Sequence, residues 1–388
     1  MKHYSLITLI LVVILSPGQL HTGGKTKSHR SHDSASAQSS TGERHEFILA
    51  TQRNRRLHVF DANTLQPLGD FRVNNNAHSV MASPDGLKLF IQQPAPPDVN
   101  NCCALFSLDL MTHKLCKLVF PSSLGVPSPD GRLLFTQRGN VGIEVFDAKT
   151  LARLPTIRAP GLYQLLPSPD GQWLFGTTYS QGGQGPSLDI FDIEKQILVR
   201  RLPIPRGLLP QGAWLGDQFY LYAHDGHQGN LWKVASETAK LDAPVKITFP
   251  DLSIEKEPIH QGVIAGGKHL FIYEGFGGKI DRRRGSDRVI PGGIFSVEPS
   301  GGKITGHFAR AVQFARVLAS ADGQWLYGID SGPADWRGPI QLLKLDALSG
   351  EVVAERALEP DVWFITLAKL PKSLIPQGEI QPDLCESH

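Results

Sequence analysis

The 388-residue sequence has almost no net charge, few cysteines and a single long apolar run. Its 39 lysines and arginines nearly balance 37 aspartates and glutamates, for a formal net charge of +2, so the composition favours no nucleic acid partner. Four cysteines in a chain of this length exclude a small domain built on disulfides. A hydrophobic share of 41% excludes both a protein with many membrane spans and a wholly disordered chain.

The single apolar run lies at the amino terminus. A positively charged start precedes apolar residues 4–15, and a Ser-Pro-Gly breaker follows them. This order is typical of a secretory signal, because a membrane span needs about 20 apolar residues. We therefore predict a secretory signal over residues 1–24 and a secreted or periplasmic protein. The cleavage site stays open, and an uncleaved anchor is the alternative. The polar residues 25–43 predict a disordered leader.

Turns rich in glycine and proline divide the rest of the chain at regular intervals. Ser-Pro-Asp-Gly begins at residues 83, 128 and 168, and Ser-Ala-Asp-Gly begins at residue 320. Proline presets the backbone angle of the second position, and glycine accepts the unusual angle of the last one. An aromatic-rich strand follows each turn, and two eroded copies lie near residues 217 and 267. The spacing of about 40 to 55 residues is typical of four-stranded propeller blades.

A second hairpin recurs seven times out of phase with these turns, typified by Val145-Phe146-Asp147-Ala148-Lys149-Thr150. Seven outer hairpins against six inner turns leave one inner strand to come from elsewhere. Residues 362–367 are predicted to supply it by pairing with residues 47–50, which closes the ring and removes open edges. The sequence thus predicts an all-β fold, a seven-bladed β-propeller over residues 44–370 with four antiparallel strands per blade. Residues 371–388 are expected to form a flexible tail.

The two repeats resemble those of secreted bacterial and archaeal seven-bladed propellers of the YVTN type. The resemblance rests on the Ser-Pro-Asp-Gly turn, the aromatic strand after it and the Val-Phe-Asp-Ala-Lys-Thr hairpin, and it covers nearly all of residues 44–370. It implies the fold and says little about function. No blade combines the Gly-His and Trp-Asp dipeptides that are typical of WD40 repeats.

A narrower stretch is similar to the heavy subunit of the quinoprotein amine dehydrogenases. The similarity rests on Asp225-Gly226, then Leu231-Trp232-Lys233-Val234, then Glu257-Pro258-Ile259-His260, and finally Gly277-Gly278-Lys279-Ile280. In that family the propeller docks a separate small subunit that carries the cofactor. The resemblance therefore implies a small subunit as a partner and an electron-transfer complex.

Propeller topology predicts that the variable loops gather on one face. The turns within the inner and the outer strand pair of each blade repeat, and they lie on the opposite face. Binding usually resides in loops that vary on a rigid scaffold. On the variable face, basic residues concentrate on blades six, seven and one, which adjoin once the ring closes. They are Lys279, Arg282, Arg283, Arg284, Arg288, Arg337, Arg53, Arg55 and Arg56. We predict that this basic crescent binds an anionic small molecule or an acidic protein, because the guanidinium fork donates two hydrogen bonds at once. Solvated loop charge is the alternative.

The mouth of the central channel is a second candidate site. Counting back seven residues from the inner turns places His78, Tyr163 and His260 at similar depth, with Gln211 near the equivalent position. Two histidines and a tyrosine lack a third clear metal ligand, so we predict no metal and no cofactor. The sequence also lacks a Gly-x-Ser-x-Gly elbow, a phosphate loop and a His-Glu-x-x-His motif, so no catalytic residues are predicted.

The four cysteines leave their pairing open. If the hairpin turns near Met111, Cys116 faces Ser107 rather than Cys103, so a simple cross-strand bridge is not predicted. In a secreted protein a disulfide is still expected among Cys102, Cys103, Cys116 and Cys385.

Three functions fit these observations. The leading one is a secreted or periplasmic, non-catalytic propeller that binds a ligand or a protein partner through its variable face. The second is the heavy subunit of an amine dehydrogenase-like complex. The third is a propeller lactonase or hydrolase, which needs at least three acids or histidines that converge on the channel.

Overall fold

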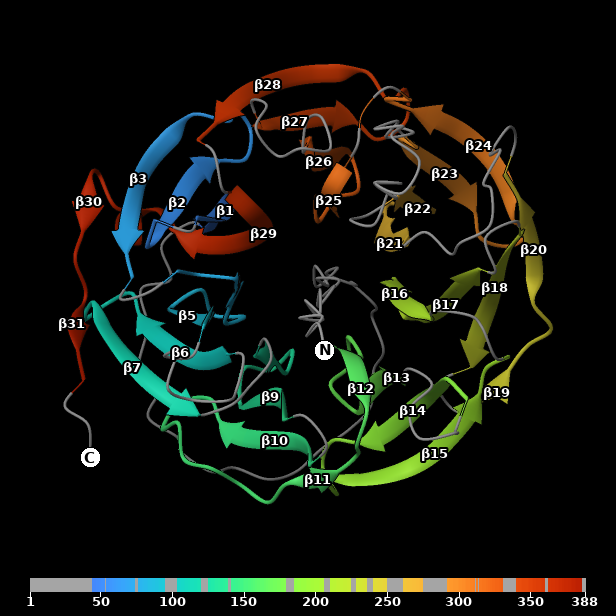
Figure 1. The fold of residues 1–388 in the computed structure, drawn as a ribbon, viewed down its shortest axis with the longest axis horizontal. Helices are drawn as coiled ribbons and strands as arrows, with labels where there is room; N and C mark the ends of the chain where they lie inside the picture. Colours follow the sequence, from blue (N-terminus) through green and yellow to red (C-terminus); the bar gives the residue numbers. More distant parts are fainter. Residues whose placement is uncertain are drawn as a thin grey trace, which may run out of the picture.

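Seven small antiparallel sheets form a ring around a central axis (Figure 1). The computed structural model describes residues 44–52, 54–73, 76–94, 103–119, 125–138, 141–178, 185–205, 210–224, 228–235, 240–249, 261–274, 292–310, 312, 314–330, 340–359 and 362–385. The predicted signal and leader, residues 1–43, lie outside this part of the chain. The seven-bladed, all-β architecture predicted from the repeats is confirmed.

Each blade is a sheet whose first strand lies nearest the axis. From the axis outward, blade one contains β29 (Val362–Pro371), β1 (Arg44–Gln52), β2 (Arg56–Asp61) and β3 (Pro67–Arg72). Blade two contains β4 (Ser79–Ala82), β5 (Lys88–Pro94), β6 (Cys103–Asp109) and β7 (Lys114–Val119). Blade three contains β8 (Val126–Pro127), β9 (Leu133–Arg138), β10 (Gly142–Asp147) and β11 (Ile157–Arg158).

The other four blades follow the same order. Blade four contains β12 (Leu162–Pro167), β13 (Trp173–Thr178), β14 (Ser187–Asp192) and β15 (Ile197–Pro203). Blade five contains β16 (Gln211–Leu215), β17 (Gln218–His224) and β18 (Gln228–Ala235), with β19 (Lys240–Leu241) and β20 (Val245–Thr248) both paired to β18. Blade six contains β21 (Gln261–Gly266), β22 (His269–Glu274), β23 (Ile294–Glu298) and β24 (Lys303–Phe308). Blade seven contains β25 (Phe314–Ala319), β26 (Trp325–Asp330), β27 (Ile340–Asp346) and β28 (Val352–Leu358).

The ring closes through the carboxyl-terminal strand, as the count of inner and outer hairpins predicted. Strand β29 pairs antiparallel with β1, and Phe47 faces Ala368 while Ala50 faces Ile365 (Figure 1). Blade one is therefore built from both ends of the folded chain. Strand β29 covers the edge of β1 that faces the axis, so this edge is not left unpaired.

The repeated inner turns owe their shape to one hydrogen-bond pattern. In the turn of blade three, the Ser128 hydroxyl donates to Asp130 (2.6 Å) and accepts from the Leu133 N–H (2.9 Å). Gly131 takes a φ of 70°, which side chains disfavour. The turns that begin at residues 83, 168 and 320 show the same serine-to-aspartate bond. The serine and the aspartate of each turn thus stabilise the turn itself.

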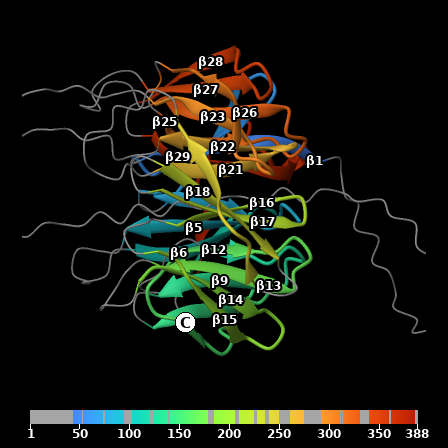
Figure 2. The ribbon, with the colours of Figure 1, turned by 90° about the vertical axis from the view of Figure 1, so that its right-hand side faces the viewer.

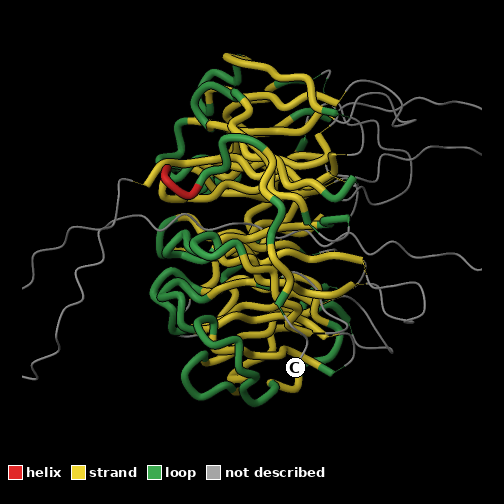
Figure 3. Tube along the Cα trace, turned by 90° about the vertical axis from the view of Figure 1, so that its left-hand side faces the viewer, coloured by secondary structure: helices red, strands yellow, loops and turns green. Residues whose placement is uncertain are grey.

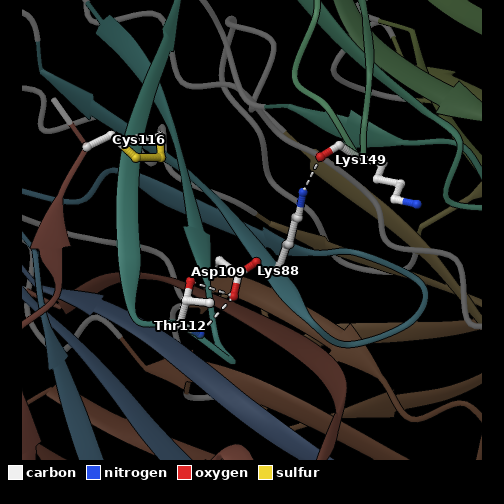
Figure 4. Close-up of a disulfide and its surroundings, with 6 residues drawn as sticks. Lys88, Asp109, Thr112, Cys116 and Lys149 are labelled. Atoms are coloured by element: carbon white, nitrogen blue, oxygen red, sulfur yellow. Dashed lines mark hydrogen bonds between the residues drawn. A yellow bond between two sulfur atoms is a disulfide. The ribbon is translucent and has the colours of Figure 1, made fainter. Parts of the chain in front are cut away.

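The outer turns use an aspartate in a similar way. Asp109 accepts the N–H groups of Met111 and Thr112 and the Thr112 hydroxyl, at 2.9 to 3.0 Å (Figure 4). Blades two and three are joined by hydrogen bonds near these turns. Lys88 of blade two donates to the carbonyl oxygens of Ala148 (3.0 Å) and Lys149 (2.8 Å) of blade three. The face that carries these turns is thus held by local bonds that repeat around the ring.

The core lies between the blades, where the aromatic strands after the inner turns pack together. Phe175 of blade four stacks on Phe219 of blade five with ring centres 4.5 Å apart, and Trp214 meets both rings edge-on. All three side chains are buried. The aromatic residues that follow the turns therefore pack the interior and do not form a surface for stacking ligands.

The carboxyl-terminal residues have more structure than the expected flexible tail. After β29, the 3-10 helix η1 (Lys372–Leu374) leads to β30 (Glu379–Ile380) and β31 (Asp383–Leu384), which pair in parallel with β3 and β7. Cys385 forms a disulfide with Cys116, with their Cα atoms 4.9 Å apart (Figure 4). The predicted register of Cys116 opposite Ser107 is confirmed, and the partner of Cys116 comes from the tail. Strands of two residues carry no sequence periodicity, so they escaped prediction.

Candidate binding site at the axis

The two faces of the ring carry different parts of the blades. Turns within strand pairs gather on one face, at the right in Figure 2 and at the left in Figure 3, where η1 also lies. The inner strands begin at the opposite face, which is the variable face of the sequence analysis. The candidate site lies near these beginnings, close to the axis.

Arg316 brings a positive charge into the interior of the ring. It is the one charged residue of the inner strand β25 and is only 4% exposed. Its guanidinium carbon lies 3.9 Å from the centre of the Phe364 ring, which belongs to the ring-closing strand β29. This contact is a cation–π interaction, and it fixes the guanidinium at the border of blades seven and one.

Burial lowers the pKa of Arg316 to about 10, while Tyr273 and Tyr163 act in the opposite direction. Arg316 therefore keeps its charge at neutral pH. Tyr273 of β22 is wholly buried, and burial raises the pKa of its hydroxyl, against the effects of Arg316 and of the Val317 N–H. The Tyr273 hydroxyl is consequently neutral at pH 7.

Tyr163 approaches this cluster from the other side of the ring. It lies on β12 of blade four, whereas Arg316 and Tyr273 come from blades seven and six (Figure 1). Tyr163 is 6% exposed, and its hydroxyl acts on the pKa values of both other residues. Four blades thus contribute to one buried cluster, which we call the axial cluster: Arg316, Tyr163, Tyr273 and Phe364.

Irregularities in three inner strands surround the axial cluster. The register of β12 shifts between Leu162 and Gln164, and that of β25 shifts between Phe314 and Arg316. The pairing of β1 with β29 shifts in the same way at its last register pair. A β-bulge turns the side chains that follow it and is frequent beside functional sites. All three bulges lie at the variable-face end of their strands.

Further buried polar groups lie at this end of the blades. Gln164 accepts the Gly212 N–H (2.9 Å) and donates to the Gly212 carbonyl oxygen (3.3 Å), which joins blades four and five. Within the described part of the chain, the Gln211 carbonyl oxygen, the Gln93 amide and the Thr177 hydroxyl are buried and have no hydrogen-bond partner. Such groups are rare in folded proteins, and an ordered water commonly satisfies them.

Two of the predicted channel residues belong to described inner strands. Tyr163 and Gln211 are buried near the start of inner strands, and Tyr163 belongs to the axial cluster. His78 precedes β4 and is exposed, and His260 lies outside the described residues. Among the described residues, no group of three histidine, cysteine or acidic side chains is arranged to hold a metal.

The basic crescent lies largely outside the described residues. Arg55 is exposed with a left-handed φ of 71°, and Arg56 lies 3.6 Å from Asp70 and 3.1 Å from Glu379. The charge of Arg56 is therefore partly balanced by acids of its own blade and of the tail. The other members are not described: Arg53, Lys279, Arg282, Arg283, Arg284, Arg288 and Arg337. The crescent stays a prediction.

Arg316 was missed by the sequence analysis. The channel residues were chosen at a fixed distance from the inner turns, and this choice did not include Arg316. The sequence does contain an indication of this residue, because Arg316 interrupts the otherwise apolar strand Phe-Ala-Arg-Val-Leu-Ala. A charge inside a strand that must be buried requires a specific environment.

Comparisons with known proteins give the fold and no family. The sequence matches no protein-family profile and no curated protein. Among solved structures, the chain is similar to a Kuenenia stuttgartiensis hydrazine synthase chain, with 15% identity and a TM-score of 0.55 over 86% of this chain and 100% of that one. It is also similar to the Pseudomonas aeruginosa periplasmic gluconolactonase PpgL, with 14% identity and a TM-score of 0.58 over 84% and 99% of the two chains.

A third similar structure is the dihydro-heme d1 dehydrogenase NirN, with 12% identity and a TM-score of 0.52 over 89% of this chain and 78% of that chain. At these identities the likeness concerns the propeller fold alone, so it does not distinguish among the three functions considered above. No helix in the described ranges has the length and apolar character needed to cross a membrane.

Proposed function

We propose that the protein is a secreted or periplasmic, non-catalytic propeller that binds an anionic small molecule at the axial cluster. The observation that carries the proposal is the buried guanidinium of Arg316, held against Phe364 close to the axis. The location follows from the predicted signal over residues 1–24 and agrees with the periplasmic location in the name of the similar gluconolactonase.

A buried arginine is well suited to anchor a carboxylate, phosphate or sulfate group. Its planar fork donates two hydrogen bonds, and the low dielectric of the interior strengthens them. The hydroxyls of Tyr163 and Tyr273 are further hydrogen-bond donors of the axial cluster. The ligand would approach along the axis from the variable face.

The composition of the axial cluster favours binding over catalysis. Its polar members are one arginine, which keeps its charge at neutral pH, and two tyrosines. Such groups orient an anion and stabilise it, but they do not serve as a general base near pH 7. This is why we place the ligand-binding function ahead of the lactonase and the amine dehydrogenase-like alternatives.

Isothermal calorimetry of the full chain with a panel of small carboxylates, phosphates and sulfates tests the proposal. For any member that binds, Arg316→Gln should raise the Kd about 10- to 100-fold, since a hydrogen bond to a charged group contributes roughly 1.5–3 kcal/mol. Arg55→Gln is the matched control, because Arg55 is exposed on the variable face. Equal affinity of wild type and Arg316→Gln would contradict the axial site.

The same experiment separates the axial site from the basic crescent. A triple Arg282→Gln, Arg283→Gln and Arg284→Gln variant removes the centre of the crescent and leaves Arg316 in place. If the triple variant loses binding while Arg316→Gln keeps it, the anion binds the crescent and the axial proposal is wrong.

A further inference from the structure

We propose that residues 371–385 form a clasp on the outside of blades one and two, and that thiol–disulfide exchange at Cys116–Cys385 opens it. The inference does not depend on the ligand-binding function. It concerns the segment that the sequence analysis expected to be a flexible tail.

The clasp connects the inside of the ring to its outer edge. It begins at the end of β29, on the face that carries the turns, and passes through η1 to the outer rim (Figures 1 and 3). There β30 pairs with β3, with Glu379 opposite Asp70, and β31 pairs with β7, with Asp383 opposite Lys114. One segment therefore covers the edge strands of two adjacent blades.

Main-chain hydrogen bonds, ion pairs and the packing of Ile380 against the core hold the outer part of the clasp. The Asp70 N–H donates to the Gly378 carbonyl oxygen (2.9 Å), the Asp383 N–H to the His113 carbonyl oxygen (2.9 Å) and the Cys385 N–H to the Leu115 carbonyl oxygen (3.1 Å). Glu379 lies 3.1 Å from Arg56 and 3.2 Å from Arg72, and these side chains are 36% to 55% exposed. Exposed ion pairs and two-residue strands contribute little stability by themselves. The disulfide is the covalent tie that joins the end of the clasp to β7.

A tight crossing fixes the path of the clasp over β3. Gly69 has no side chain, and a Cβ atom at this position would clash with the carbonyl oxygens of Pro376 and Gly378. Substitution of Gly69 consequently pushes the clasp away without touching the disulfide. This position offers a second, independent way to open the clasp.

The disulfide is placed where a reductant can reach it. Cys116 lies on β7 of blade two, and both Cys116 and its partner Cys385 are partly exposed. A thiolate of a dithiol reductant attacks the sulfur of one cysteine, forms a mixed disulfide with it and releases the other cysteine as a thiol. The second thiol of the reductant then attacks the reductant's own sulfur in the mixed disulfide and releases the first cysteine. The products are the two cysteine thiols and the oxidised, disulfide form of the dithiol, so two electrons and two protons pass to Cys116 and Cys385.

Reduction opens the clasp and leaves the ring closed. Strand β29 keeps its long antiparallel pairing with β1, which runs from Arg44 opposite Pro371 to Gln52 opposite Val362. The outer edges of β3 and β7 become free once residues 376–385 depart, and free strand edges pair readily with added strands. The disulfide therefore controls access to two edges and does not control the fold.

Hydrogen exchange with mass spectrometry on the full chain tests the clasp. Reduction by dithiothreitol should raise the exchange rates of the Asp70 and Cys385 amides at least about tenfold, while peptides from β1 and β29 stay protected. Cys385→Ser should show the fast exchange without reductant. A Cys102→Ser, Cys103→Ser variant is the control and should behave like the oxidised wild type.

Gly69→Ala supplies a second measurement in the oxidised protein. It should raise exchange at the Asp70 amide while the disulfide stays intact, because it displaces β30 alone. Unchanged exchange at Asp70 and Cys385 after reduction would overturn the proposal. So would loss of protection in β1 and β29, since that result would make the disulfide a support of the whole fold.

Discussion

The guanidinium of Arg316 rests on the Phe364 ring, 3.9 Å from its centre, and so joins blade seven to the strand that closes the ring. Both residues lie next to register shifts in their inner strands. The axial cluster therefore forms only when β29 has paired with β1. Ring closure and assembly of the candidate site are one structural event.

Phe364→Leu tests how far the aromatic ring positions Arg316. Loss of the cation–π contact removes about 0.5–2 kcal/mol of interaction, so anion affinity should fall about 2- to 30-fold. The free energy of unfolding in urea should fall by about 1–2 kcal/mol, because leucine fills most of the buried volume. Tyr163→Phe is the comparison variant, and it should lower affinity with little effect on stability. Full affinity in Phe364→Leu would show that the ring is packing alone.

The pH dependence of anion binding should follow the charge of Arg316. Burial holds the pKa of this guanidinium at about 10, below its ordinary value, so the charged form persists through the neutral range. Affinity should stay constant between about pH 6 and 9 and fall above about pH 10 as the folded protein loses this proton. Calorimetric titrations in this range give the profile. A decline centred near pH 6 to 7 would point to a histidine instead.

The serine of the inner turns should matter more than the proline beside it. Ser128→Ala removes the acceptor of the Leu133 N–H and the donor to Asp130, so the free energy of unfolding should fall by about 1–2 kcal/mol. Pro129→Ala keeps both bonds and should lower it by less than about 1 kcal/mol. Urea denaturation of the two variants gives the comparison. Equal losses would mean that backbone rigidity, not the hydroxyl, stabilises the turn.

The aspartates of the turns should make the fold sensitive to acid. Bonds from the Thr150 N–H and hydroxyl hold the pKa of Asp147 below its ordinary value, and the pKa of Asp346 is lowered in the same way by Ser349. A carboxylate with a lowered pKa stabilises the fold above its unfolded pKa, and that stabilisation disappears as the pH falls through the folded pKa. Unfolding measured from pH 6 to 3 should thus show falling stability below about pH 4.

Asp147→Asn gives the matching control for this acid effect. The amide oxygen can still accept the turn bonds but does not titrate in this range. The variant should be less stable than wild type at pH 6, and the gap should narrow toward pH 3. A constant gap across the range would place the acid sensitivity in other groups.

The sequence predicted the ring because its turns and hairpins repeat. Each copy of the Ser-Pro-Asp-Gly turn makes the same local bonds, so its position could be read without knowledge of the tertiary structure. The imbalance between inner and outer hairpins also identified residues 362–367 as the closing strand, and the observed register agrees.

The site and the clasp could be predicted only in part, because they depend on contacts between distant segments. Counting along the inner strands found Tyr163 and Gln211 but not Arg316, whose burial depends on Phe364 from the far end of the chain. The pairing of Cys116 with Cys385 depends on a path across two blades that no local pattern encodes.

An experimental structure of the protein bound to an anion from the panel tests the central claim most directly. Our account predicts an anion oxygen about 2.7–2.9 Å from a guanidinium nitrogen of Arg316, the usual length of a charge-assisted hydrogen bond, with Phe364 still beneath the guanidinium. An anion bound only to the arginines of the basic crescent, or only on the face that carries the turns, would contradict it.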